Sequence, residues 1–264
     1  MQSWQIFENK CTDYLKSKFS KYASFAGQGG SDSTVSDILV ETKVGRVFYI
    51  EAKEEQAQCG QFVLFPNKET NRFEYSEFNK TKLNEYSRSI MDFLDKHFDE
   101  FSDVGTAGID INMPNSQEVF SNWIKTAYGG KRTRFFISKN YAIIPIDDFD
   151  KAFSVTAKYR VKKSGSSPVP AKYVDDVSNY IRTNFPGTRL AVLEKKLIAE
   201  TNLSVDKIEF EIDGNHFMFS SKGGDRYEIR KLSNTYNANV IFSVKYINDN
   251  FKLSDGEFID ELQS

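Results

Sequence analysis

Four segments of the chain carry apolar side chains at the spacing of an amphipathic helix. They are residues 3–19, 80–100, 116–128 and 173–185. In the first of them, Glu8 lies within the apolar stripe, one turn after Trp4. A carboxylate in that position must be paired, lie at the edge of the stripe, or face a functional cleft.

Short runs rich in β-branched and aromatic residues, bounded by turn residues, predict strands. Residues 37–42 and 46–53 flank the turn signal Lys43-Val44-Gly45 and form a predicted hairpin. A second predicted hairpin joins 134–138 to 141–146. Four later strands are predicted at 207–212, 216–221, 226–232 and 239–247, with glycine-containing turns at 213–214 and 223–224 between the first three. This order of elements predicts an α/β or α+β fold with mixed sheets flanked by helices.

The first hairpin carries the residues with the most informative chemistry. Glu51 and Lys53 are two positions apart on a predicted strand, so their side chains share one face while Ala52 points the other way. Asp37 begins the facing strand. In a chain with 27% charged residues, such a set also arises by chance on a plain surface strand. Its context is more specific, because it closes an apolar strand and follows a glycine-rich loop.

The length of the hairpin loop decides whether the three side chains meet. A two-residue loop would place Asp37 on the face opposite to Glu51 and Lys53. A three-residue loop, either 43–45 or 44–46, places all three on one face, and the glycine shared by both loops accepts the positive φ that such turns need. The hypothesis of a joint site therefore requires an odd loop or a bulge.

With that register, two carboxylates and the carbonyl of Ala52 form a hard oxygen site, which suits Mg²⁺ with several waters retained. Such an ion lowers the pKa of a bound water and stabilises charge developing on a phosphate. Lys53 can orient or help deprotonate the attacking water and neutralise charge in the transition state. Together these roles suffice for phosphodiester hydrolysis.

Positive charge is concentrated in one segment. The formal net charge is −2, but residues 119–174 hold eleven Lys and Arg against three Asp and Glu. A basic segment on an otherwise acidic chain is typical of a localised phosphate-binding surface. An ordinary solvated face would have the same composition, so charge alone leaves both alternatives open.

Composition narrows the class of protein. A hydrophobic fraction of 39% and an aromatic fraction of 14% are typical of a globular protein with a core. No apolar run is long enough to span a membrane, and the charged N-terminal segment argues against a signal peptide, so we expect a cytoplasmic protein. Cys11 and Cys59 have no metal-ligand spacing and are expected to be reduced and buried, with Cys59 a candidate neighbour of the site. His97 and His216 are too few for a zinc site or a histidine-based nuclease site.

The arrangement resembles the PD-(D/E)xK nuclease superfamily, with Ser36-Asp37 as the first motif and Glu51-Ala52-Lys53 as the second. Over nearly the whole chain the sequence is similar to HhaI-type type II restriction endonucleases. The similarity is dense in 1–165, returns at 232–244 and is thin between them. Its blocks, in matching order, are GGSDSTVSDIL, FYIEAK, QCGQFVL, NWIK, YRVKKSGS and LSNTYNANVIFSV. Thirteen residues separate Asp37 from Glu51, two more than in the family pattern, and the hairpin turn is the natural place for them.

The resemblance implies a Mg²⁺-dependent enzyme that cleaves double-stranded DNA at GCGC, acts as a monomer, and has a cognate DNA methyltransferase as its genetic partner. Asp37 and Glu51 would ligate the metal together with the Ala52 carbonyl, and Lys53 would act on the water. Glu8 falls at a matching helix position, where it would hold a metal-bound water or be a satisfied carboxylate at the helix edge.

Candidate DNA contacts lie in three places. Gln58 and Gln61 follow the catalytic strand and would contact the scissile phosphate or the minor groove, or serve a turn. The basic loop near 162–166 is a candidate for reading base edges in the major groove, as is the polar cluster at 234–239, which would otherwise cap loops. Phosphate contacts would instead position the protein without reading sequence. The predicted set is Ser36, Gln58, Gln61, Lys158, Arg160, Lys162, Lys163, Ser164, Ser166, Asn234, Thr235, Asn237 and Asn239.

We expect a catalytic domain at 1–150. A DNA-recognition module would comprise 151–170 and 231–264, and an inserted α+β module at 171–230 would make non-specific DNA contacts. The stretch 164–168 is the best linker candidate because of its Ser and Gly content. The alternatives are a DNA repair or junction nuclease on the same core and a DNA-binding module without catalysis. Magnesium-stimulated cleavage separates the enzymes from the module.

Overall fold

The structure is a computed structural model that describes residues 3–28, 35–163, 165–233 and 236–264. The chain divides into two compact units, Met1–Val161 with Ala238–Ser264, and Lys162–Asn237. None of the helices in the described ranges is long and apolar enough to cross a membrane. The functional division into catalytic, recognition and inserted modules stays a prediction.

The first sheet of unit 1 has the strand order β1-β2-β3-β7-β8. All its neighbouring strands are antiparallel except β3 and β7, which are parallel. Its strands are β1 (Ala23–Gly27), β2 (Ile38–Thr42), β3 (Val47–Ala52), β7 (Thr133–Ile137) and β8 (Ile143–Pro145). Because β3 and β7 run parallel, their carboxyl ends lie at the same edge of the sheet, and the candidate residues Glu51 and Lys53 lie at that edge.

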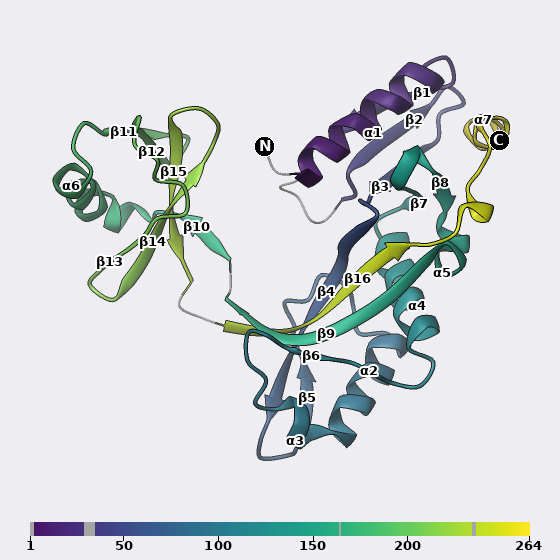
Figure 1. Cartoon of the computed structure of the whole chain (residues 1–264), viewed down its shortest axis with the longest axis horizontal. Coiled ribbons are helices and arrows are strands. Elements are labelled where there is room, and N and C mark those ends of the chain that lie inside the picture. The colour runs from purple at the N-terminus through teal and green to yellow at the C-terminus, as the bar shows by residue number, and fades with distance from the viewer. Residues whose placement is uncertain (1–2, 29–34, 164, 234–235) are drawn as a thin grey trace. The chain divides into compact units, whose positions relative to one another are not determined.

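Helices cover both faces of this sheet, as the alternating pattern predicts. On one face α1 (Ser3–Phe19) and α7 (Asp255–Gln263) share a core with the strands, in which the Phe19 and Phe258 rings pack edge-to-face at 4.9 Å. On the other face Phe136 and Ile144 belong to a core with α4 (Ser116–Gly129) and α5 (Phe149–Ala152). Figure 1 shows α1 lying alongside β1 and β2.

A second sheet in unit 1 has the order β5-β4-β16-β9-β6. Figure 1 shows β9 and β16 running side by side in this sheet. One of its faces packs on α2, α3 and α4 around Trp123, which is 1% exposed. Its elements are β4 (Gln56–Asn67), β5 (Arg72–Tyr75), β6 (Ile109–Asp110), β9 (Phe153–Lys163) and β16 (Tyr236–Tyr246), with α2 (Glu85–Lys96) and α3 (Phe98–Phe101) beside them.

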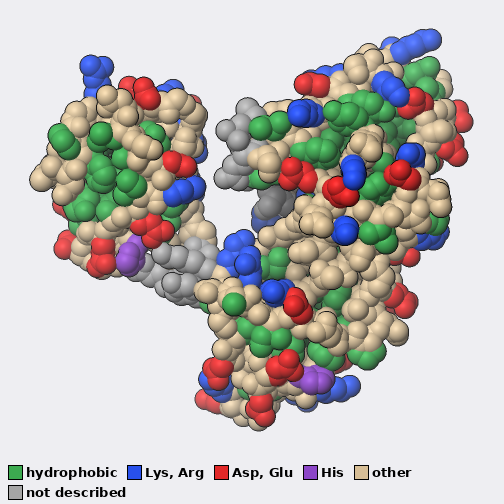
Figure 2. All heavy atoms as spheres, in the orientation of Figure 1, with side chains coloured by type: hydrophobic (Ala, Val, Ile, Leu, Met, Phe, Trp, Pro, Cys, Tyr) green, Lys and Arg blue, Asp and Glu red, His purple; other side chains and the backbone are tan. Residues whose placement is uncertain are grey.

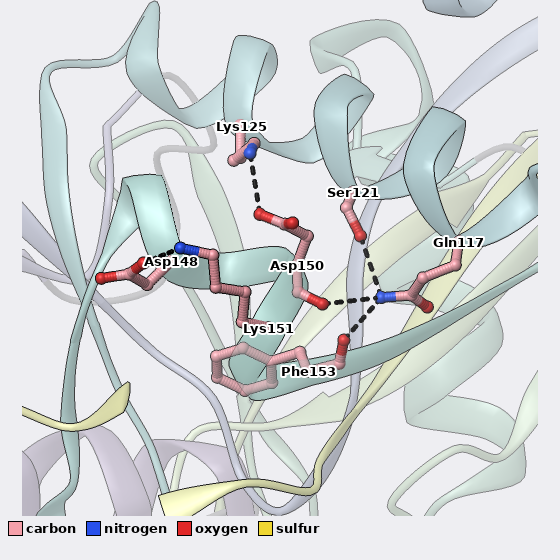
Figure 3. Close-up of polar contacts among 7 residues, drawn as sticks. All are labelled: Gln117, Ser121, Lys125, Asp148, Asp150, Lys151 and Phe153. Carbon is pink, nitrogen blue, oxygen red and sulfur yellow. Dashed lines mark hydrogen bonds and ion pairs between the residues drawn. The ribbon is translucent and has the colours of Figure 1, made fainter. Parts of the chain in front are cut away.

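Hydrogen bonds and an ion pair join α4 to the start of β9 and the residues just before it (Figure 3). The Gln117 side-chain amide donates to the carbonyls of Asp150 and Phe153 at 3.1 and 2.8 Å, and its oxygen accepts the Val155 N–H at 2.8 Å. Lys125 of the same helix pairs with Asp150 at 2.8 Å. Partly buried backbone groups at the start of β9 thus find partners on α4, which fixes where this long strand begins.

Unit 2 is a six-stranded sheet with one helix. The strand order is β11-β12-β15-β14-β13, and β10 pairs with the last residues of β15, 230–232. The sheet packs through Phe217, Phe219 and Ile229 against Val177 and Ile181 of α6. Its elements are β10 (Ser166–Pro168), α6 (Val174–Asn184), β11 (Arg189–Leu193), β12 (Lys196–Glu200), β13 (Glu209–Ile212), β14 (Asn215–Ser221) and β15 (Arg226–Leu232). Short 3-10 turns complete the chain at Lys139–Tyr141, Ile146–Asp148, Ala171–Tyr173 and Asp249–Phe251.

The predicted α+β class, both hairpins and all four helical segments are confirmed. The segment 80–100 is shorter than predicted, because Asn84 caps α2 and places its first residue at Glu85. The linker prediction at 164–168 is wrong for Ser166–Pro168, which pair with β15. Their sequence has no β-branched residue, so the pairing depends on a partner strand about 60 positions away. Strands β1, β5, β6, β11 and β12 and helices α5 and α7 were not predicted from the sequence.

Candidate active site

The hairpin register unites the predicted site residues. β2 and β3 pair Ile38 with Ile50, which sets Asp37 opposite Glu51. The loop has three residues and ends at Gly45, whose φ of +87° lies in the region that favours glycine. The predicted odd loop is therefore confirmed, in its 43–45 form.

Backbone hydrogen bonds hold the site residues in place. The Asp37 carboxylate accepts the Ala52 N–H at 2.9 Å, and the Lys53 N–H donates to the Ile137 carbonyl at 2.9 Å, which extends the pairing of β3 with β7. The Lys53 ammonium lies 2.5 Å from a Glu51 carboxylate oxygen, with only 14% and 6% of these two side chains exposed. Ala52 is buried in the core on the α1 side, as predicted.

Glu8 of α1 also faces this group. Burial, then the charge and hydrogen bond of Asp37, raise the pKa of Glu8 to about 7. Burial, then the charge of Glu51, raise the pKa of Asp37 to about 6. Burial alone would lower the pKa of Lys53, but Glu51 and Asp37 outweigh it and the pKa is raised, so this lysine is held as an ammonium ion. The charge of Glu8 on the helix therefore interacts with those of Asp37, Glu51 and Lys53 on the hairpin.

The donor set fits a magnesium ion. In the described ranges, no three His, Cys, Asp or Glu side chains gather closely enough to bind a metal by themselves. An ion here would therefore rest on Asp37 and Glu51, the Ala52 carbonyl and water, which is how proteins usually hold Mg²⁺. Burial first, and then the neighbouring carboxylates, raise the pKa values of Glu8 and Asp37, and a cation bound here would favour their charged forms.

One contact of the site was not apparent from the sequence, whereas Cys59 lies near the site as expected. The hydroxyls of Ser36 and Thr133 hydrogen-bond at 2.7 Å and are buried, so this pair ties the residue before Asp37 to β7. A DNA contact by Ser36 stays a prediction, and its 1% exposure argues against it. Cys59 and Tyr128 are buried together beside Lys53, and burial raises the pKa of the Cys59 thiol to about 12. Both cysteines are free and buried, as predicted.

A β-bulge sets the direction of the two glutamines after the catalytic strand. Gln61 pairs with Ile241 and Gln58 with Ser243, so Cys59 and Gly60 together oppose a single residue of β16. Without the extra residue, positions 58 and 61 would point to opposite faces. With it, both glutamines are exposed on one face, and Gln58 Nε2 donates to Gln61 Oε1 at 3.1 Å. Cys59 points into the core.

Gly60 is required by this bulge, which leads to a stability prediction. Its φ is +90°, and a Cβ there would lie 2.8 Å from the Trp123 ring. We expect Gly60→Ala to lower the free energy of unfolding by about 2–4 kcal/mol, from backbone strain and overpacking together. The control is Gly45→Ala, with φ +87° and no atom within 4 Å, which should cost only the strain of about 1–2 kcal/mol. Urea unfolding measures both, and equal losses would contradict the role of Trp123.

The exposed face of the second sheet gathers several predicted DNA contacts. Along β9, Ala157 and Tyr159 point into the core, so Lys158, Arg160 and Lys162 form a row on the other face. Figure 2 shows blue side chains over this strand. Lys158 pairs loosely with Asp110 at 3.5 Å. Gln58 and Gln61 lie on the same face, because their neighbours Cys59 and Phe62 belong to the core.

The remaining predicted contacts differ in their surroundings. Asn239 is buried at 3% exposure and Asn237 is half-buried. The hydroxyl of Ser166 accepts Arg230 Nε at 3.0 Å on the β10–β15 pair. Ser164, Asn234 and Thr235 lie outside the described residues. The base contacts assigned to these residues and to Lys163 stay predictions.

One comparison bears on the family of this chain. A search of solved structures finds the HhaI endonuclease in complex with DNA, with 36% sequence identity, a TM-score of 0.82, and coverage of 99% of this chain and 99% of that chain. No family model and no curated protein match the chain. Identity of this level over essentially both full lengths, with the hairpin geometry above, shows that the chain belongs to the HhaI-type family of type II restriction endonucleases, which are site-specific deoxyribonucleases.

Proposed function

We propose that this enzyme hydrolyses phosphodiester bonds of double-stranded DNA with Mg²⁺, through a PD-(D/E)xK-type site made of Asp37, Glu51 and Lys53. The observation that carries the proposal is the hairpin register, which sets the two carboxylates opposite each other with the lysine on the same face. A plain surface strand would have no need to bury Glu51 at 5% exposure beside a second carboxylate.

The chain's own residues have separable tasks in this proposal. Asp37, Glu51 and the Ala52 carbonyl hold the ion, which when bound lowers the pKa of water and neutralises phosphate charge. Lys53, kept protonated by its carboxylate neighbours, orients the attacking water and neutralises charge on the phosphate oxygens. The water oxygen bonds to phosphorus as one P–O ester bond breaks, leaving a phosphate monoester and a hydroxyl. Glu8 holds a water at the rim of the group.

We further propose GCGC as the recognition site, which rests on the family resemblance. The exposed row on β9 would contact the DNA backbone, and the segments near 162–166 and 234–239 would read base edges. Action as a monomer rests on the same resemblance. A cognate methyltransferase that modifies the same sequence would protect host DNA.

A digest of a sequenced plasmid tests this proposal most directly. With Mg²⁺ we expect discrete fragments whose ends all map to GCGC, and with EDTA no cleavage. Discrete ends at another sequence would refute the site but keep the enzyme class. Cleavage at branched or damaged DNA without sequence preference would favour a repair or junction nuclease instead.

Two lysines should separate base reading from backbone contact. We expect Lys163→Ala to cost about 1–3 kcal/mol in binding and to relax preference at one base pair. Lys158 lies on the exposed strand face, so Lys158→Ala should weaken binding to all DNA sequences alike. It should also reduce the slope of log K against log salt concentration by about 1. Competition binding with each base pair of GCGC changed in turn, at two salt concentrations, measures both. If Lys163→Ala weakened every competitor equally, base reading would fall to the 234–239 cluster.

A further inference from the structure

A basic cavity in unit 1 is not used by the mechanism above. It has a volume of about 430 Å³ and lies between residues 80–84 and the end of α4. Of the described residues that line it, three are lysines, Lys80, Lys82 and Lys131, and none is acidic. Among the described residues, Lys82 and Lys131 form no ion pair. The Lys131 ammonium instead lies 4.6 Å from the centroid of the Tyr128 ring. The positive charge of Lys82 and Lys131 beside a cavity of this size favours an anionic ligand.

One lysine of the cavity, Lys131, lies near the catalytic group. Lys131 stands two residues before Thr133, whose hydroxyl bonds Ser36, the neighbour of Asp37. Tyr128, under the Lys131 ammonium, is buried with Cys59 beside Lys53. The positive charge of Lys131 acts on Asp37, where it opposes the rise of that carboxyl's pKa. An anion in the cavity would therefore lie next to a phosphate being cleaved at Asp37.

Hydrogen bonds fix the opposite wall of the cavity. The Tyr75 hydroxyl donates to the Thr81 carbonyl at 2.7 Å. The Asn79 side chain accepts from the Val63 N–H at 2.7 Å and donates to the Val63 carbonyl at 2.9 Å. Asn84 caps α2 with a reciprocal bond to Ser87, so the end of this helix is already occupied by its own cap. The lysines thus stand on a preorganised frame, which reduces the entropy lost on binding.

We infer that this cavity binds one backbone phosphate of the cleaved DNA strand, adjacent to the scissile phosphate, with Lys82 and Lys131 as positioning residues. The inference rests on the proposed catalytic site. A strand whose phosphodiester lies at Asp37 carries further phosphates at a regular spacing, so the next one along the backbone falls close to any neighbouring basic cavity. Holding it would fix the strand along its axis and set the scissile bond against the attacking water.

Neutral methylphosphonate linkages test this inference, because each removes the charge of one chosen phosphate. In the unaltered enzyme, we expect one position adjacent to the cut to lower kcat/KM about tenfold or more. Lys131→Ala and Lys82→Ala should lower kcat/KM on natural DNA by a similar factor. On the DNA carrying that single methylphosphonate, the same variants should have little further effect, since their partner charge is already gone. The control is Lys96→Ala, at the other end of α2. It should lower kcat/KM by the same small factor on every substrate, whichever phosphate is replaced.

The outcomes discriminate between the alternatives. Equal effects of Lys131→Ala on all methylphosphonate substrates would overturn the inference, as would the absence of any sensitive position next to the cut. A free anion is the other source of this chemistry: inorganic phosphate that inhibits the unaltered enzyme but not Lys131→Ala, with no methylphosphonate coupling, would also overturn it. Thermal melting of each variant checks that it is folded. If Lys53→Ala still cleaved DNA, the proposed catalytic site would fail, whereas the coupling result would still say whether a phosphate sits at Lys131.

Discussion

Replacement of Lys53 by alanine should lower the rate of DNA cleavage by about a thousandfold or more, while specific DNA binding changes only a few-fold. Lys53 lies at the predicted point of attack, with its ammonium 2.5 Å from a Glu51 carboxylate oxygen and 14% of its side chain exposed. A preorganised charge in a partly dehydrated site contributes mainly to the transition state, where removal of a single donor costs about 10²–10³ in rate. Loss of the water-orienting role adds to that cost. Single-turnover cleavage, with binding measured separately in Ca²⁺, gives the two quantities.

Another lysine of the same edge provides a matched control. Lys139 pairs with Glu55 at 2.9 Å, but 49% and 46% of these side chains are exposed. Lys139→Ala should therefore change cleavage and stability little, as exposed ion pairs usually do. Lys53→Ala leaves Glu51 buried without its partner, so its melting must be checked. A folded Lys53→Ala enzyme that cleaves at near-normal rate would remove the proposed mechanism.

The catalytic hairpin was accessible from sequence because strand geometry is local. Alternation fixes which of Glu51, Ala52 and Lys53 share a face, and a glycine near the turn limits the loops available. Sequence alone did not decide between loops 43–45 and 44–46, because both give the required faces. Pairing along the whole of β2 and β3 selects the first.

Features that depend on distant partners were not predictable in this way. The bulge at Cys59-Gly60 exists because β16, far along the chain, lies beside β4 with Trp123 beneath it. Ser36 was a candidate DNA contact from its place in the motif, but Thr133, about a hundred residues later, takes up its hydroxyl. Lys131 had no sequence signal beyond its place in a basic segment. Its position near Asp37 depends on the contact between Thr133, two residues later, and Ser36, which the sequence does not show.

Removal of one catalytic carboxylate should abolish magnesium-supported cleavage. Asn replaces Asp37 with a side chain of the same shape that can still accept the Ala52 N–H. It removes one of the two carboxylates proposed to bind the ion directly, and the affinity of a site for Mg²⁺ depends strongly on ligand charge. Titration calorimetry in the presence of DNA should show weaker metal binding for Asp37→Asn. Unchanged metal affinity would show that Asp37 is not a ligand.

The same substitution should stabilise the metal-free protein at pH 8, because burying an ionised Asp37 beside Glu51 opposes folding there. Asp37 has a folded-state pKa of about 6 against an ordinary value of 3.8, so the unfolded chain loses this proton first as the pH rises. Stability is therefore lost between about pH 4 and 6 and stays lost above that window, by at most about 3 kcal/mol. Asp37→Asn avoids the loss, so in EDTA its free energy of unfolding should exceed that of the unaltered protein at pH 8 and match it near pH 4. Glu41→Gln, at an exposed position on the same strand, should show no such pH-dependent gain. Saturating Mg²⁺ should reverse the order at pH 8, since the ion offsets the charge only where Asp37 is present. Suppose that Asp37→Asn is no more stable than the unaltered protein in EDTA at pH 8. Ionised Asp37 would then not destabilise the fold, and the electrostatic argument for a cation at this site would be refuted.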